Sequence, residues 1–121
     1  MARILLVEDD LMNRDMLARR LTWEGHQVIV AADGRQAVSL AQAEHPDIIL
    51  MDLGLPIMNG WEAARHIKTA RETSSIPVIA LTAFAMSEDR QKALAVGCDE
   101  YETKPVDFPR LLAKIRTLLD A

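Results

Sequence analysis

Short apolar runs recur along the chain, and longer stretches with helical spacing separate them. The runs are Ile4–Val7, Val28–Ala31, Ile48–Met51 and Pro77–Leu81. Because these runs lack polar alternation, they predict strands that are buried on both faces, as the strands of parallel sheets are. Strands that alternate with helices form βαβ units, whose helices cover both faces of the sheet. The pattern therefore predicts a doubly wound α/β fold.

Five helices are expected to alternate with five strands. In the first helix the expected apolar stripe consists of Met12, Met16, Leu17 and Leu21. The fifth strand, Asp99–Glu102, is the weakest, because a single aromatic residue stands among acids, and we place it at the edge of the sheet. We expect one domain over residues 1–121, a five-stranded parallel sheet of the flavodoxin-like (βα)5 type with strand order 2-1-3-4-5.

The composition excludes several classes of protein. The 121 residues include 18 acids and 14 bases, so the formal net charge is -4, and the chain lacks the basic footprint of a nucleic-acid-binding protein. The longest apolar runs are about five residues, far below the roughly 18 that a membrane span needs. A single cysteine, Cys98, excludes an internal disulfide. We expect a cytoplasmic protein that binds neither nucleic acid nor membrane directly.

Polar side chains follow four of the predicted strands at their carboxyl ends, the edge where open α/β sheets bind ligands. They are Glu8, Asp9 and Asp10 after the first strand, Asp52 after the third, Thr82 after the fourth and Lys104 after the fifth. Asp52 is the least easily explained as an ordinary solvated loop residue, because it directly follows a buried run. Asp10 is as well suited to capping the following helix as to a role in a site.

Carboxylates that converge on one edge repel each other unless cations lie among them. Glu8, Asp9 and Asp52 contribute -3 and Lys104 contributes +1, which leaves -2 for a divalent cation to neutralise. Oxygen ligands select a hard ion, and two or three carboxylates with water suit Mg²⁺. A carboxylate beside magnesium, an ammonium group and a hydroxyl is equipped for phosphoryl transfer, in which the carboxylate attacks phosphorus.

These motifs, in this order, resemble the receiver domain of two-component response regulators over the whole chain. The matching segments are Ile4–Asp10, Met51–Pro56, Asn59-Gly60, Ala80–Ala83, Gly97–Asp99 and Lys104-Pro105. The resemblance implies that Asp52 is the phospho-acceptor. It also implies that Asp9 binds magnesium directly, that Glu8 does so through water, and that the backbone carbonyl of Gly54 completes the set.

The resemblance implies further roles near the acceptor. Lys104 would contact the phosphoryl oxygens and precede a cis peptide bond to Pro105. The Thr82 hydroxyl would bind the phosphoryl group, and Tyr101 would be the switch aromatic. Gly54 and Phe84 stand where the family tunes loss of the phosphoryl group, and neither has a polar side chain.

The function implied by the resemblance is that of a two-component response regulator. Such a receiver takes a phosphoryl group from a sensor histidine kinase or a histidine phosphotransfer protein, in a magnesium-dependent reaction. It then presents a changed surface to a downstream protein target. It is not a metabolic enzyme, because it catalyses only its own phosphorylation and dephosphorylation. No output domain is expected, and the sequence leaves the oligomeric state open.

Other functions stay open. Within the family, the chain could be a phosphorelay intermediate or a receiver excised from a hybrid kinase. A phosphatase with an aspartyl nucleophile usually has a second acid two residues after it, where this chain has Gly54. A flavin or nucleotide binder would need a glycine-rich loop after the first strand, where this chain has acids.

Overall fold

The computed structural model describes residues 2–55, 57–83 and 87–120, without the side chains of residues 87–90. Five parallel strands form one sheet in the order β2-β1-β3-β4-β5, so the predicted fold is confirmed. The strands are β1 (Arg3–Val7), β2 (Gln27–Ala31), β3 (Ile48–Asp52), β4 (Val78–Thr82) and β5 (Glu100–Thr103). The helices are α1 (Leu11–Trp23), α2 (Gly34–Glu44), α3 (Gly60–Thr69), α4 (Ser87–Ala95) and α5 (Phe108–Leu119).

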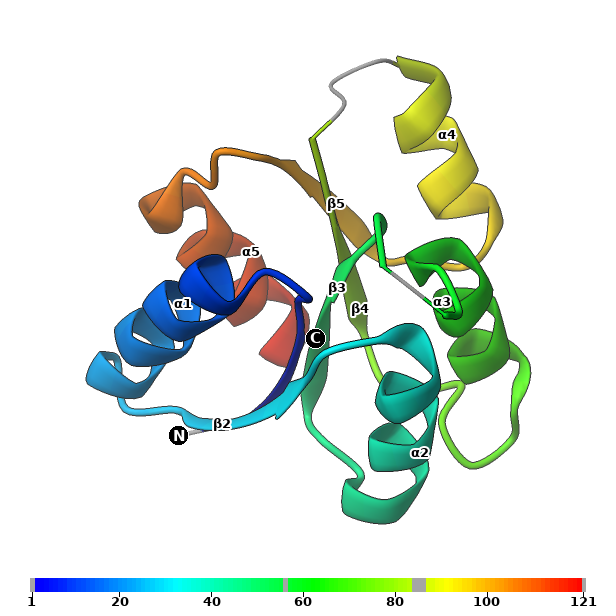
Figure 1. The fold of residues 1–121 in the computed structure, drawn as a ribbon, viewed down its shortest axis with the longest axis horizontal. Helices are drawn as coiled ribbons and strands as arrows, with labels where there is room; N and C mark the ends of the chain where they lie inside the picture. The colour runs from blue at the N-terminus through cyan, green and yellow to red at the C-terminus, as the bar shows by residue number, and fades with distance from the viewer. Residues whose placement is uncertain (1, 56, 84–86, 121) are drawn as a thin grey trace.

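Helices cover both faces of the sheet, with α1 and α5 on one face and α2, α3 and α4 on the other (Figure 1). Successive residues of β1 point alternately into two cores. Ile4 and Leu6 pack in the core below α1 and α5, whereas Leu5 and Val7 pack in the core below the other three helices. Both faces exclude water, which is why the strands need no polar alternation. Full burial of each such aliphatic side chain contributes about 1.5–3 kcal/mol.

Short polar side chains start four of the helices. Asp10, Asp33, Asn59 and Asp107 each accept a hydrogen bond from a backbone N–H in the first turn of the helix that follows. Such a cap is typically worth about 1 kcal/mol, because it satisfies a donor that the helix itself leaves unpaired. Asp10 therefore has the capping role that its position allows.

The prediction for the apolar stripe of α1 is wrong for its two methionines. Leu17 and Leu21 are buried, but Met12 is 81% exposed and Met16 is 54% exposed. At about 100° per residue, the two methionines and Trp23 lie opposite the leucines on the helix. The helix thus has one apolar face packed on the sheet and a second in contact with solvent. None of the described helices has the length and apolar character of a membrane span.

The edge position of β5 is confirmed, but its acids are not all solvated. Glu102 is only 3% exposed. Its carboxylate pairs with Arg110 Nε at 3.3 Å and with Lys114 Nζ at 3.1 Å, and both cations come from α5. The last helix therefore supplies the counter-charges that allow an acid to be buried in the outermost strand.

Candidate functional site

The register of the parallel strands brings the predicted site residues to one edge of the sheet. Val7 of β1 lies opposite Met51 of β3, and Thr82 of β4 lies opposite Thr103 of β5. Three polar residues each stand one position beyond a member of these pairs, and they are Glu8, Asp52 and Lys104. Glu8 and Asp52 start at the same height on the neighbouring strands β1 and β3, whereas Lys104 follows β5, beyond β4, and reaches them with its long side chain.

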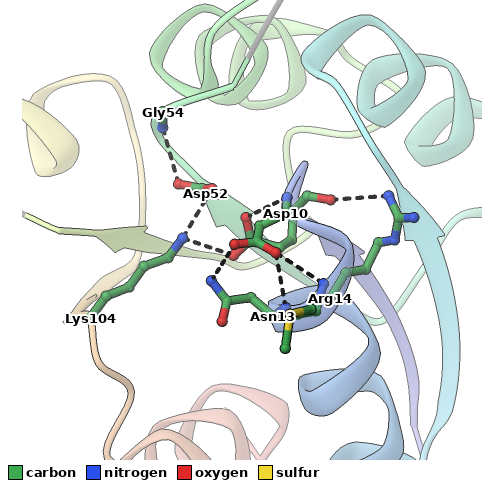
Figure 2. A network of polar contacts seen from close by, with 8 residues as sticks. Asp10, Asn13, Arg14, Asp52, Gly54 and Lys104 are labelled. Atoms are coloured by element: carbon green, nitrogen blue, oxygen red, sulfur yellow. Dashed lines mark hydrogen bonds and ion pairs between the residues drawn. The ribbon is translucent and has the colours of Figure 1, made fainter.

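Lys104 connects the two buried carboxylates. Its Nζ atom lies 2.8 Å from Glu8 Oε1 and 3.0 Å from Asp52 Oδ2, as Figure 2 shows for the lysine and the aspartate. The backbone N–H of Gly54 donates to Asp52 Oδ1 at 3.0 Å. The backbone N–H of Asp10 donates to Glu8 Oε2 at 3.3 Å. Glu8 and Asp52 are only 1% and 6% exposed, so these contacts carry most of their hydrogen bonding.

The two carboxylates differ in acidity. Burial, assisted by a hydrogen bond and the charge of Asp52, raises the pKa of Glu8 to about 7 although Lys104 opposes the shift. Burial also acts to raise the pKa of Asp52, but hydrogen bonds from Glu8, Gly54 and Lys104 outweigh it and lower that pKa. The pair therefore takes up its first proton near neutral pH, and Glu8 is the more basic member. Asp52 keeps its charge, which leaves its oxygens available as a nucleophile.

The acid pair raises the pKa of the Lys104 ammonium in turn. Burial alone would lower this pKa, but hydrogen bonds and charge from Glu8 and Asp52 outweigh it. The lysine is therefore a permanent cation at the centre of the site. The Lys104–Pro105 peptide bond, which follows β5, is cis, as the resemblance implies.

The acidic residues can share one divalent cation. Oxygens of Glu8, Asp9 and Asp52 all lie within 4.8 Å of one another, and Asp9 is exposed to solvent. An all-oxygen set with an open, solvated side fits Mg²⁺, which usually keeps several waters. Lys104 Nζ bonds one oxygen of Glu8 and one of Asp52. The donor chemistry of these residues therefore fits the predicted magnesium site.

A cavity of about 420 Å³ opens beside the acceptor carboxylate. Asp52, Gly54, Thr82 and Lys104 form part of its wall, together with Leu53, Trp61 and Ala83. Thr82 is buried at this wall, at the end of β4. Tyr101 is half-buried on β5 and packs against the core on the α2, α3 and α4 face. Phe84 lies outside the described residues.

Trp61 is the site residue that the sequence does not reveal. It is spaced from Ala64 and Ile67 as a member of an apolar helical stripe, and this pattern indicates only a residue of the core. The structure shows that Trp61 packs against the core and also lines the acceptor cavity. The only signal that could have located it is its position directly after Gly60, where α3 begins near the site.

Two glycines allow the loop after Asp52 to pack closely. A Cβ atom on Gly34 would lie 2.0 Å from the carbonyl oxygen of Met58. A Cβ atom on Gly60 would lie 2.2 Å from the carbonyl oxygen of Asp52. The first residues of α2 and α3 therefore touch the loop backbone itself, and the position of the acceptor depends on this contact.

Comparisons with known proteins show the family and agree with the fold. The model of the response regulator receiver domain matches residues 4–116. The chain is 41% identical over 119 residues to protein PilH of Pseudomonas aeruginosa, covering 98% of each chain. It is 37% identical over 116 residues to the polar-differentiation response regulator DivK of Brucella ovis, covering 96% of this chain and 94% of DivK.

Solved structures of other receivers have the same fold. The receiver domain of a sensor histidine kinase from Pseudomonas aeruginosa, which has a magnesium ion coordinated in its active-site cleft, superposes with a TM-score of 0.92. It is 36% identical, and the match covers 99% of this chain and 98% of that one. Chemotaxis protein CheY4 of Vibrio cholerae superposes with a TM-score of 0.91 at 31% identity, covering 98% of each chain.

Proposed function

This chain belongs to the response regulator receiver family, and we propose that Asp52 is the residue at which it accepts a phosphoryl group. One observation carries the proposal: the Asp52 carboxylate ends β3 at the wall of a cavity, is nearly buried, and is bonded to Lys104 and Gly54. Its lowered pKa keeps it ionised at neutral pH. The same contacts fix the direction in which its oxygens point.

We propose that Glu8, Asp9, Asp52 and the backbone carbonyl of Gly54 hold magnesium in this site. The support is the clustering of the three carboxylates and their oxygen-only chemistry. A related receiver has magnesium in the equivalent cleft. When bound, the ion supplies positive charge for the oxygens of the phosphoryl group.

The residues of the chain itself carry out the transfer. An oxygen of Asp52 attacks phosphorus, the bond between phosphorus and the donor nitrogen breaks, and its electron pair stays on the donor imidazole. Lys104 Nζ, already 3.0 Å from Asp52 Oδ2, neutralises charge on the transferred group. The Thr82 hydroxyl on the cavity wall donates a hydrogen bond to it. The donor is a phosphohistidine of a sensor kinase or phosphotransfer protein.

The geometry favours a signalling module over a phosphatase. A phosphatase with an aspartyl nucleophile needs a second acid to protonate its leaving group. At Gly54, a Cβ atom would lie 3.9 Å from Asp52 Oδ1, so a side chain there would stand beside the acceptor. This chain has no side chain at that position. It therefore lacks an acid at the position from which such phosphatases protonate the leaving group.

Direct mapping of the modified residue tests the acceptor. The full chain is incubated with acetyl phosphate and Mg²⁺, the acyl phosphate is trapped by borohydride reduction, and the modified peptide is identified by mass spectrometry. We expect one modification, at Asp52, and none when EDTA removes the metal. Modification of Asp9 or of any other residue in place of Asp52 would contradict the proposal.

We propose that Thr82 and Tyr101 transmit phosphorylation to the surface formed by α4, β5 and α5. They lie on neighbouring strands, since Tyr101 is opposite Ala80, two residues before Thr82. A phosphoryl group adds a charge of about -2 and three acceptor oxygens, which attract the Thr82 hydroxyl. Movement of Thr82 vacates space beside β4, into which the half-buried Tyr101 turns. The downstream protein then meets a changed surface.

Amide NMR with a magnesium–beryllofluoride complex, which mimics the phosphoryl group, tests this switch. We expect signals to shift across residues 82–86 and 101–104, because both segments follow the movement. The last turns of α2, away from its contact with the loop after Asp52, should respond little, which makes them the internal control. Shifts confined to residues 8–10 and 52–54 would contradict the switch and favour a phosphorelay intermediate.

A further inference from the structure

Trp61 joins the acceptor cavity to helix α4. It is the second residue of α3 and lines the same cavity as Asp52 and Lys104. The Nζ atom of Lys92, on α4, lies 4.7 Å from the centroid of its ring, within the range of a cation–π contact. One indole therefore contacts both the site and a lysine of α4, a helix whose described side chains do not line the cavity.

The start of α3 fixes the backbone of Trp61 against the acceptor. The backbone N–H of Gly60 donates to the carbonyl oxygen of Leu53 at 3.1 Å. At Gly60 the helix approaches the backbone of Asp52 and Leu53 so closely that a Cβ atom would lie 2.2 Å and 2.5 Å from their atoms. The indole can therefore change its place only by side-chain rotation. Lys92 and the core against which Trp61 packs oppose that rotation.

The wall that Trp61 forms bears on the loss of a phosphoryl group from Asp52. Hydrolysis requires a water molecule in line with the bond between phosphorus and the carboxylate oxygen. Apart from the acceptor, the described polar side chains of this wall are a hydroxyl, Thr82, and an ammonium, Lys104. Neither is a base that would activate water, so the rate depends on whether water can occupy the line of attack. An indole excludes water from the volume it fills.

We propose that Trp61 is a positioning residue that slows hydrolysis of the phosphoryl group on Asp52, and that Lys92 holds the indole in place. In the step that it slows, a water oxygen attacks phosphorus and the bond to Asp52 breaks. The carboxylate leaves with the electron pair, and the proton of the water passes to solvent. The inference rests on the proposed role of Asp52 as acceptor. It adds α4 to the elements that determine how long the modified state lasts.

The lifetime of the modified chain tests the inference. The wild type, Trp61→Ala, Trp61→Phe and Lys92→Gln are phosphorylated with acetyl phosphate, the donor is removed, and loss of the phosphoryl group is followed at fixed Mg²⁺. We expect hydrolysis to be about tenfold faster for Trp61→Ala and about two- to fivefold faster for Lys92→Gln. Trp61→Phe keeps an apolar ring and should lie between wild type and Trp61→Ala. Trp23→Ala, at the exposed end of α1, is the matched control and should match wild type.

Tryptophan fluorescence provides a second test, which does not depend on whether the Trp61→Ala variant folds. The chain has two tryptophans, so in a Trp23→Phe background the emission comes from Trp61 alone. We expect magnesium–beryllofluoride to change this emission, and Lys92→Gln to alter the change. If Trp61 has only a structural role, Lys92→Gln should leave the change in emission caused by magnesium–beryllofluoride as it is in the wild type.

The outcomes separate this inference from the proposed function. If the wild type accepts no phosphoryl group, the proposed function fails and the inference fails with it. If Asp52 is modified but Trp61→Phe and Lys92→Gln lose the group at the wild-type rate, the inference alone is overturned. Faster loss in these two variants, with an unchanged Trp23→Ala, supports it.

Discussion

Asp52→Asn is expected to abolish phosphorylation, with incorporation falling at least about a hundredfold. Asparagine has nearly the volume of aspartate, and its carbonyl oxygen can still accept from the N–H of Gly54. The amide oxygen is a poor nucleophile, however, and the variant removes one of the three clustered carboxylates. Incorporation is measured with a radiolabelled small phosphodonor at saturating Mg²⁺, and again with a phosphorylated kinase as donor.

The matched control is Asp15→Asn, which removes an exposed carboxylate from α1 that pairs with Arg19 one turn further along the same helix. It carries the same change of charge and should be phosphorylated like the wild type. Asp52→Asn should remain folded, because it relieves the repulsion between Asp52 and Glu8 and removes a buried charge. Substantial incorporation into Asp52→Asn would show that the acceptor is another residue.

Lys104→Met is expected to destabilise the fold by about 2 kcal/mol near pH 8. Methionine keeps the apolar stem but removes the ammonium, which lies 2.8 Å from Glu8 and 3.0 Å from Asp52. Removing one partner of a fully buried ion pair costs about 3–5 kcal/mol, and the lysine side chain here is 22% exposed, so we expect a smaller loss. Urea denaturation in EDTA measures it. Arg65→Met, which removes an exposed cation from α3, is the control and should cost little.

The cost of Lys104→Met is expected to increase with pH. Without the ammonium, the pKa of Glu8 in the folded state rises further above its unfolded value than the value of about 7 in the wild type. A carboxyl group with a raised folded pKa stabilises the fold while it is protonated, and this contribution is lost as pH rises through the folded pKa. The free energy of unfolding of the variant should therefore be closest to that of the wild type at about pH 5.5 and furthest from it at about pH 8.5. A cost that is equal at both would contradict the assignment of the proton to Glu8.

The parts of the site that the sequence predicts are those that the sheet itself positions. Asp52 is the last residue of β3, and Lys104 directly follows β5, so a correct strand assignment already brings them to one edge. Parallel pairing then places Asp52 beside Glu8 without any knowledge of side-chain conformation, whereas Lys104, beyond β4, reaches both carboxylates with its side chain. The non-alternating strands were equally informative, because only burial on both faces permits them.

The sequence is less informative where a helix contacts something other than the sheet. Met12 and Met16 satisfy the spacing of an apolar stripe, but Leu17 and Leu21 are the residues that turn toward the sheet. Glu102 is buried because two cations of α5 pair with its carboxylate. No local sequence pattern predicts these ion pairs, because their partners lie on different elements. Periodicity describes one helix at a time, whereas these outcomes depend on which neighbour each face meets.

The contact of Gly60 with the acceptor strand has a consequence for how the chain tolerates change. Gly34 and Gly60 have no functional group, yet any side chain at either one would collide with the backbone of the loop that follows Asp52. Substitutions there displace the acceptor and are expected to be as damaging as loss of its carboxylate. In a map of mutational sensitivity, these glycines would resemble reactive residues. If the loop after Asp52 is replaced by that of another receiver, the first residues of α2 and α3 must be replaced with it. These three segments are therefore expected to change together in evolution.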